Sequence, residues 1–180
     1  MHDLDSVLRE NIRIMAQVIT EVCQRNTRGQ LSDPPLSRNQ FYLLNILAKS
    51  GGFPVGELAR ILDISNAATS KNIDRLEALG YVGRSVNASD RRSMEVSLTP
   101  AGTMFVEEFE RITAEKQKPL MAAFTEEEKT LLLGLLRRVI RHTLADEQNC
   151  DLICLQCGGR CGSECSVEDL AGICRRSARS

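Results

Sequence analysis

The chain has 180 residues, of which 42% are apolar and 26% are charged, and its 23 Lys and Arg residues nearly balance its 24 Asp and Glu residues. The resulting net charge of −1 excludes a polybasic protein that holds nucleic acid by bulk charge. The apolar fraction excludes a disordered chain. One of the seven cysteines is Cys23, whereas the other six lie between residues 150 and 174. We therefore expect one domain with a separate C-terminal appendage.

The sequence has none of the patterns typical of export or membrane insertion. Residues 1–10 carry four charges and no signal-like apolar run, and the longest apolar runs are far too short to span a bilayer. These features predict a cytoplasmic protein without membrane contact. In that reducing compartment, clustered cysteines bind metal or take part in redox chemistry more often than they form structural disulfides.

The first half of the chain reads as a series of helices. Apolar residues from position 4 to position 22 recur at three- and four-residue steps, which predicts an amphipathic helix that fades at 27–29, before a linker at 34–35. Ser37 and Gln40 form a capping-box pattern that opens a second helix, which ends near residue 49. Two short helices are predicted next, at 55–62 and about 66–79, where Gly80 ends the second.

The periodicity changes after Gly80. Segments 81–86 and 94–98 alternate in polarity around a polar, basic stretch, which predicts a hairpin with a long tip. Thr99 and Pro100 form a helix start, and that helix is expected to break or kink at Pro119. Thr125 with Glu128 opens a last helix, whose apolar face comprises Leu132, Leu135, Leu136, Val139, Ile140 and Leu144.

This order of elements predicts a mainly α fold with a small β-hairpin wing (α+β), that is, a winged helix-turn-helix. The apolar stripes of the terminal helices exceed what one compact domain buries, so we expect a homodimer formed through the N- and C-terminal helices. The chain divides into a dimerisation helix and linker (1–36), the winged helix-turn-helix (37–99), further dimerisation helices (100–148) and a Cys-rich tail (149–180).

Five short segments and one arginine resemble the MarR family of bacterial transcription regulators over residues 4–148. They are Gly56-Glu57-Leu58-Ala59, Ile64-Ser65, residues 73–82, Arg84, Asp90-Arg91-Arg92-Ser93 and Leu98-Thr99-Pro100-Ala101-Gly102. The resemblance implies a homodimer, usually a repressor, that binds double-stranded DNA at a palindromic operator and releases it on a chemical signal. No paired carboxylates, phosphate loop or nucleophile–base arrangement stands out, so no enzymatic activity is expected.

A recognition helix reads bases with its N-terminal turns. Its exposed candidates for DNA contact are Asn66, Thr69, Ser70, Lys71 and Arg75, since Asn pairs with adenine and Ser and Thr contact bases or phosphate. Asn66 can equally serve as a helix-capping residue. In the hairpin, the candidates are Arg84, Asp90, Arg91 and Arg92, with Asp90 orienting an arginine toward the minor groove or the phosphates.

The local charge of this region is as balanced as that of the whole chain. Residues 55–98 contain six cations and six carboxylates, so DNA binding must come from a few well-placed cations rather than from a basic surface. We therefore predict weak non-specific affinity and a modest dependence on salt.

The six tail cysteines are the candidate metal ligands. They are Cys150, Cys154, Cys157, Cys161, Cys165 and Cys174. Dense thiolates without histidine favour an iron–sulfur cluster, of the 4Fe-4S kind, although the spacing departs from that of ferredoxins. The alternatives, in order, are structural zinc, for which Cys154 and Cys157 make a good pair, and a metal-free thiol–disulfide sensor. Four ligands suffice for one site, so two of the six thiols are spare or serve a second metal.

These patterns lead to one main hypothesis and two alternatives. The main hypothesis is a sequence-specific DNA-binding transcriptional regulator, a repressor in preference to an activator, whose operator binding is modulated by a cluster, metal or redox signal in the tail. The first alternative is a MarR-type regulator that responds to a small organic ligand and carries a purely structural zinc tail. The second is an iron–sulfur electron-transfer or protein-docking module that does not bind DNA.

Overall fold

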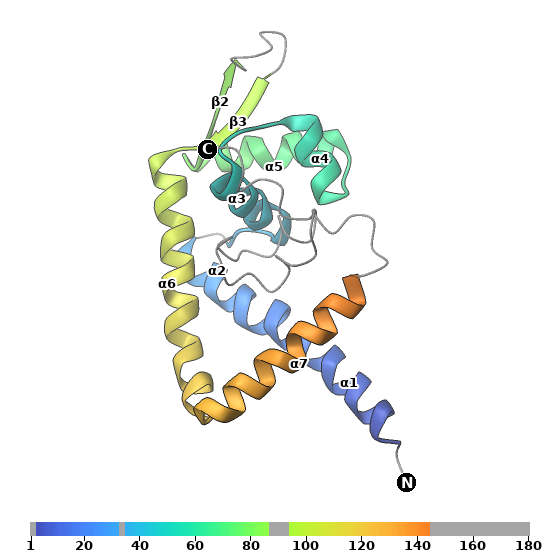
Figure 1. Cartoon of the computed structure of the whole chain (residues 1–180). Coiled ribbons are helices and arrows are strands. Elements are labelled where there is room, and N and C mark those ends of the chain that lie inside the picture. Colours follow the sequence, from blue (N-terminus) through green and yellow to red (C-terminus); the bar gives the residue numbers. More distant parts are fainter. Residues whose placement is uncertain (1–2, 33–34, 87–93, 145–180) are drawn as a thin grey trace.

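The computed structural model describes residues 3–32, 35–86 and 94–144 (Figure 1). Helices dominate, and three short strands form one sheet. The elements in chain order are α1 (Leu4–Gln17), the π-helix η1 (Val18–Gln24), α2 (Arg25–Leu31), α3 (Arg38–Ser50), β1 (Phe53–Pro54), α4 (Val55–Leu62), α5 (Asn66–Ala78), β2 (Val82–Val86), β3 (Met94–Leu98), α6 (Pro100–Ala122) and α7 (Glu126–Leu144). The predicted mainly α fold with a small antiparallel hairpin is confirmed.

The sheet is antiparallel, with strand order β1-β3-β2. β2 and β3 form the predicted hairpin, in which Val82 pairs with Leu98 and Val86 with Met94. β1 pairs with β3 through Phe53 and Val96. Sequence reasoning missed β1, because two residues are too few to show an alternating pattern.

The core is built around α3, which contacts α4, α5, β3 and α6. Leu43, Leu44 and Ile46 are fully buried. The ring of Phe41 lies 4.1 Å, centroid to centroid, from that of Phe109 on α6, which fixes the N-terminal half of α6 against the lobe. The lobe formed by α3, α4, α5 and the sheet therefore packs as one unit.

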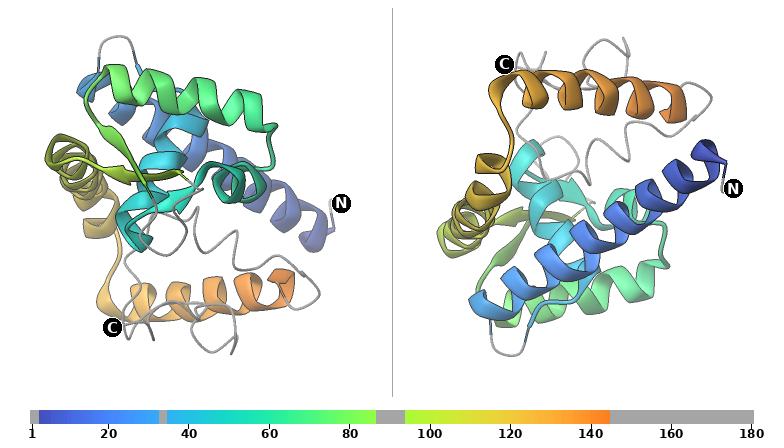
Figure 2. Two further views of the ribbon diagram at one scale, coloured as in Figure 1. Left: turned by 90° about the horizontal axis from the view of Figure 1, so that it is seen from above. Right: turned by 90° about the horizontal axis from the view of Figure 1, so that it is seen from below.

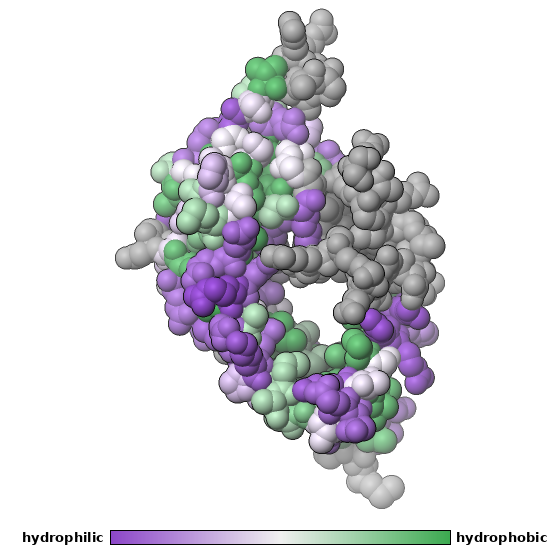
Figure 3. Space-filling view, turned by 60° about the vertical axis from the view of Figure 1, so that its left-hand side comes forward, coloured by the Kyte–Doolittle hydropathy of each residue, from purple (hydrophilic) through white to green (hydrophobic). Residues whose placement is uncertain are grey.

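The terminal helices lie outside this unit. α7 stands apart from the lobe in both views of Figure 2, and α1 extends away from it (Figure 1). Their large apolar side chains are exposed, and hydrophobic residues gather at the surface where α6 ends and α7 lies (Figure 3). These exposed residues are Leu4, Val7, Leu8, Ile14, Met15, Val18, Ile19, Leu131, Leu132, Leu133, Leu135 and Val139.

Local signals placed most helix ends correctly. The side chain of Ser37 accepts a hydrogen bond from the backbone N–H of Gln40 (3.3 Å), and the side chain of Gln40 accepts one from Ser37 (2.9 Å). Thr125 and Glu128 form the same reciprocal pair, at 3.2 Å and 2.8 Å. Both predicted capping boxes are confirmed.

Two predicted helix ends were wrong. The first helical region does not fade at 27–29 but continues to Leu31, because Thr27 and Arg28 are buried and Lys116 Nζ donates to Thr27 Oγ1 at 3.4 Å. α6 continues through Pro119 to Ala122, since a proline in the last turn of a helix removes only one backbone hydrogen bond.

No helix in the described part of the chain is long and apolar enough to cross a membrane.

The segment Leu98–Gly102 joins α6 to the end of α5. Thr99 donates from its N–H to the carbonyl of Tyr81 (3.0 Å) and from its hydroxyl to the carbonyl of Gly80 (2.6 Å). Gly102 donates back to the Thr99 hydroxyl (3.1 Å). A Cβ atom on Gly102 would lie 2.0 Å from the Tyr81 carbonyl oxygen. Position 102 therefore requires glycine, because α6 begins this close to the backbone of the turn after α5.

Candidate nucleic-acid interface

α4 and α5 form a helix-turn-helix around a tight turn. Asp63 adopts a left-handed conformation (φ 53°) and ends α4, a conformation that Asp tolerates better than most residues. Ser65 then caps α5, because its side chain accepts a hydrogen bond from Ala68 N at 3.2 Å. Ile73 and Leu76 are fully buried, so α5 is anchored by one face and exposes the opposite one.

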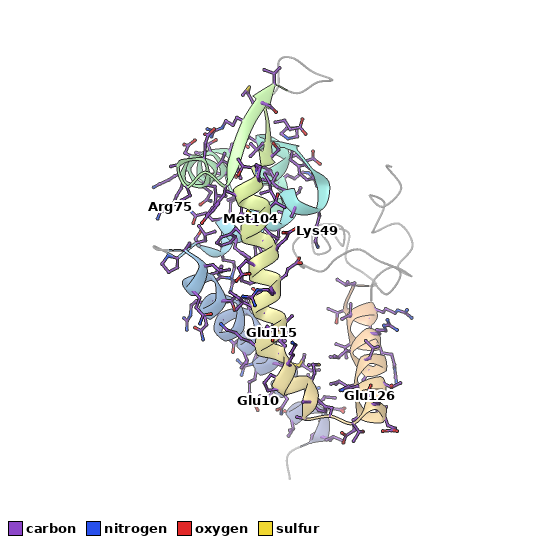
Figure 4. All side chains as sticks on the ribbon, turned by 90° about the vertical axis from the view of Figure 1, so that its left-hand side faces the viewer. Glu10, Lys49, Arg75, Met104, Glu115 and Glu126 are labelled. Carbon is purple, nitrogen blue, oxygen red and sulfur yellow. The ribbon has the colours of Figure 1, made fainter. Side chains whose placement is uncertain are left out.

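The exposed face of α5 carries most of the predicted contact residues. Asn66, Lys71 and Arg75 are exposed, and Ser70 is half-buried. Figure 4 shows Arg75 at the end of the molecule opposite to Glu126 of α7. Lys71 and Arg75, four residues apart, therefore lie together on the side of α5 that faces away from the core, whereas Asn66 is exposed at the N-terminal end of the helix.

The expectation that Thr69 is exposed was wrong. Its side chain is fully buried, and its hydroxyl donates to the carbonyl of Ser65 at 3.1 Å. Thr69 lies four residues before Ile73 and seven before Leu76, which places all three on the core face of the helix. This spacing is visible in the sequence and could have corrected the prediction. The Thr69 side chain packs the helix and cannot reach DNA.

Arg84, predicted as a DNA-contact residue of the hairpin, faces α5. It lies in the middle of β2, on the same side of the strand as the buried Val82. Its guanidinium binds two carboxylates of α5, with Nη2 2.5 Å from Asp74 Oδ1 and Nη1 bonded to Glu77 Oε2. The hydrogen bond that Arg84 donates to Asp74 is the main cause that raises the pKa of Arg84. The remaining wing candidates, Asp90, Arg91 and Arg92, lie outside the described residues.

The tail cysteines Cys150 to Cys174 likewise lie outside the described residues. Within the described ranges, no group of three or more His, Cys, Asp or Glu side chains is arranged to hold a metal ion. The predicted tail ligands and the described residues therefore do not overlap.

A buried arginine marks a second polar location, where α2, α3 and α6 meet. Arg28 is 6% exposed, and its guanidinium carbon lies 5.6 Å from the centre of the Phe41 ring. Among the described residues, Nε and Nη1 of Arg28, Oε1 of Gln24 and Oγ1 of Thr113 are buried without a hydrogen-bond partner. Burial, and then the charge of Arg38, lower the pKa of Arg28. Buried donors of this kind require a partner.

The helix-turn-helix with an adjoining hairpin defines this chain as a winged-helix protein, a class that binds DNA. Residues 35–93 match the sequence model of the MarR family. The chain is 31% identical over 134 residues to the transcriptional regulator YwaE of Bacillus subtilis, covering 74% of each chain. It is 32% identical over 110 residues to the regulator PecS of Dickeya dadantii, covering 59% of this chain and 66% of PecS. The chain belongs to the MarR family of transcriptional regulators.

Solved structures share the fold. The YusO protein of Bacillus subtilis aligns with a TM-score of 0.62 at 24% identity, covering 78% of this chain and 99% of YusO. A MepR mutant of S. aureus bound to an oligodeoxyribonucleotide aligns with a TM-score of 0.54 at 22% identity, covering 79% of this chain and 99% of MepR. The winged-helix architecture of the described residues is thus the one found in these structures.

Proposed function

We propose that this regulator binds a palindromic operator as a homodimer, in which α5 of each protomer enters the major groove and the wing contacts the adjacent backbone. The observation that carries the proposal is the pair of exposed cations, Lys71 and Arg75, on the side of α5 away from the core, with Asn66 exposed at the N-terminal end of the helix. The unpartnered apolar faces of α1 and α7 support dimerisation, and a dimer places two recognition helices about one duplex turn apart, roughly 34 Å. Repression follows when such a complex blocks a promoter.

Substitution of Lys71 by alanine tests this interface. Binding to a duplex that carries the promoter region of the gene encoding this protein is expected to weaken by about tenfold, since each base or phosphate contact contributes about 1–3 kcal/mol. The measurement is fluorescence anisotropy over a range of salt concentrations. The wild type should show a slope that corresponds to fewer than about ten phosphate contacts per dimer, because the interface holds few free cations.

Lys118→Ala is the matched control, because it removes the same charge near the far end of α6, where Lys118 pairs with Glu115 at 2.7 Å. Its operator affinity should equal that of the wild type. Equal affinity of both variants would argue against α5 as the reading element. A wild type that binds no duplex at all would revive the alternative of a docking or electron-transfer module.

We further propose that the tail holds an iron–sulfur cluster that modulates operator binding. The support is the donor set: six thiols lie within 25 residues of each other, without a histidine among them, and thiolates are the ligands of such clusters. The tail follows directly after α7, so a change in the cluster can shift that helix and alter the spacing of the two recognition helices. A tenfold change in affinity requires only about 1.4 kcal/mol of coupling.

Replacing all six tail cysteines by serine tests this proposal. Anaerobically purified wild type should show a broad absorption band near ~400 nm together with iron and sulfide, and the variant should show neither. Operator affinity of the wild type should change on exposure to air, whereas that of the variant should not. A colourless wild type that contains zinc would indicate a structural zinc site in place of the cluster. A folded variant with unchanged operator affinity and an unchanged response to air would show that the tail has no part in regulation.

One observation favours the alternative of an organic ligand. The buried Arg28 has two donor nitrogens, Nε and Nη1, without a hydrogen-bond partner among the described residues, and its guanidinium lies over the Phe41 ring. The nearby carboxylate of Glu21 already bonds to Arg38. An organic anion could supply the missing acceptor and lay an apolar part against Phe41. Because Arg28 lies between α2, α3 and α6, such a ligand would act where the dimer helices meet the DNA-binding lobe.

Arg28→Met removes the charge and keeps most of the side-chain volume. With benzoate as a probe, the wild type is expected to gain thermal stability and lose operator affinity, since a ligand that binds only the folded state raises the melting temperature. The variant should lose both responses and be as stable as the wild type or more stable, because a buried unpaired charge has been removed. Arg25→Met, at a neighbouring exposed position, should respond like the wild type. A response that survives in Arg28→Met would place the ligand elsewhere.

A further inference from the structure

Arg84 connects the wing to the recognition helix. Asp74 and Glu77 lie three residues apart, about one turn along α5, so a single guanidinium in front of the helix reaches both. Nη2 bonds to Asp74 at 2.5 Å and Nη1 bonds to Glu77. Arg84 extends from the middle of β2, where it pairs in register with Val96 of β3. Arg84 therefore ties the middle of β2 to α5.

The same geometry argues against Arg84 as a phosphate ligand. Two of its N–H groups are bonded to carboxylates, and its side chain is only 28% exposed. The two carboxylates carry two negative charges against one positive charge, so the local sum stays negative. A phosphate would meet only the remaining N–H groups of a mostly covered guanidinium, beside a net negative charge.

We infer that Arg84 is a positioning residue for operator binding, which fixes the angle between the wing and α5 and screens two carboxylates of the recognition helix from the DNA backbone. This inference rests on the proposed binding of DNA by α5 and the wing. The two elements are also joined by the turn at Gly80, whose φ of +76° is a conformation that glycine adopts freely, and by the hydrogen bond that Tyr81 N donates to the carbonyl of Leu76 at 2.9 Å. Without the Arg84 bridge, the hairpin would be held to α5 mainly by that turn and by the packing of Val82.

A second consequence concerns charge. Side chains of Asp74 and Glu77 are 63% and 40% exposed, so their charges would act on nearby phosphates once Arg84 is removed. Because Arg84 itself makes no phosphate contact, its removal should lower affinity without lowering the number of counterions released on binding. A phosphate ligand would lower both. The salt dependence of binding therefore separates the two roles.

The experiment compares the DNA affinity of Arg84→Ala, Arg84→Lys and the triple variant Arg84→Ala/Asp74→Asn/Glu77→Gln. The DNA is a duplex that carries the promoter region of the gene encoding this protein. Arg84→Ala is expected to bind about tenfold more weakly with the same salt slope as the wild type. The triple variant should recover about threefold, because the unscreened carboxylates are gone. Arg84→Lys should fall between Arg84→Ala and the wild type, since an amine cannot bridge both carboxylates as a fork does. A slope lowered by about two per dimer, or unchanged affinity in Arg84→Ala, would overturn the inference.

Hydrogen exchange of the free protein gives a readout that does not depend on DNA. Amides of β2 and β3 should exchange faster in Arg84→Ala than in the wild type, whereas those of α3 should not change; equal exchange in β2 and β3 would overturn the inference. If Arg84→Ala does not fold, Asp74→Asn/Glu77→Gln retains the arginine and frees it. That variant should show a steeper salt slope and a smaller preference for the promoter duplex over an unrelated one, and the absence of both changes would also overturn the inference. Failure of the wild type to bind DNA would refute the proposed function, while the exchange data would still test the bridge.

Discussion

Leu135→Glu is expected to convert the protein into a folded monomer whose operator affinity is lower than that of the wild type by about a hundredfold or more. Leu135 is 46% exposed on α7 and lies on the apolar face that we assign to the dimer. A carboxylate there would be buried without a partner on dimerisation, which carries a penalty of several kcal/mol. A monomer engages one half-site only and loses the gain from simultaneous binding of two.

Thr130→Glu is the matched control. It places the same carboxylate on the same helix, five residues before Leu135, at an exposed position on the side away from the apolar face. Light scattering after size exclusion should find a dimer for the wild type and the control, and a monomer for Leu135→Glu. Circular dichroism should show equal helix content in all three, because Leu135 lies outside the core around α3. A dimeric Leu135→Glu with wild-type affinity would contradict the assignment of this face.

Sequence reasoning succeeded where the determining interactions are local. The bounds of α4 and α5 follow from Ser65, Gly80 and the apolar spacing between them, and the start of α6 follows from Thr99 and Pro100. Caps and turns act within four residues of the positions that they determine, so a single sequence contains the whole signal. The same holds for the mainly α fold class and for the exposed side of α5, apart from Thr69.

The remaining features depend on contacts between distant segments. From the sequence alone, Arg84 is interpreted as a wing cation; the fold places β2 beside α5 and brings Arg84 to Asp74 and Glu77, ten and seven residues away in sequence. From the sequence alone, Arg28 is interpreted as part of the polar end of the first helix; in the fold it is buried where α2, α3 and α6 meet. In both cases the sequence shows the charge, but only the fold shows which group faces it. The roles of Arg91, Arg92 and the tail cysteines stay predictions.

The Leu-Thr-Pro-Ala-Gly segment illustrates how a motif can be recognised before its physical reason is known. The resemblance identified Leu98–Gly102, and the structure supplies the reason for its glycine, which is the close approach of α6 to the backbone after α5. Because Tyr81 and Gly80 follow the recognition helix directly, the contact also ties α5 to the first turn of a helix that leads toward the proposed dimer interface. The motif is therefore a junction between the reading element and the scaffold.

Gly102→Ala is expected to lower the free energy of unfolding by about 2–3 kcal/mol per protomer. The added Cβ would lie 2.0 Å from the Tyr81 carbonyl oxygen, which is backbone and cannot rotate away. α6 must shift, and a shift weakens the hydrogen bonds that Thr99 makes to Tyr81 and Gly80. Overpacking of this kind typically costs about 1–3 kcal/mol, and the lost hydrogen bonds add to it, against a gain of up to about 1 kcal/mol from helix propensity.

Gly56→Ala provides the control, because a Cβ at that helical position meets only Asn66 Oδ1, at 4.0 Å. It should leave stability unchanged or raise it slightly. The measurement is urea unfolding at a fixed protomer concentration, since dimer dissociation makes the transition concentration-dependent. A loss below about 0.5 kcal/mol in Gly102→Ala would mean that α6 moves without cost, and the glycine would then have no role in holding the recognition helix to the scaffold. A large loss in Gly102→Ala alone would establish the close approach as the reason for the motif.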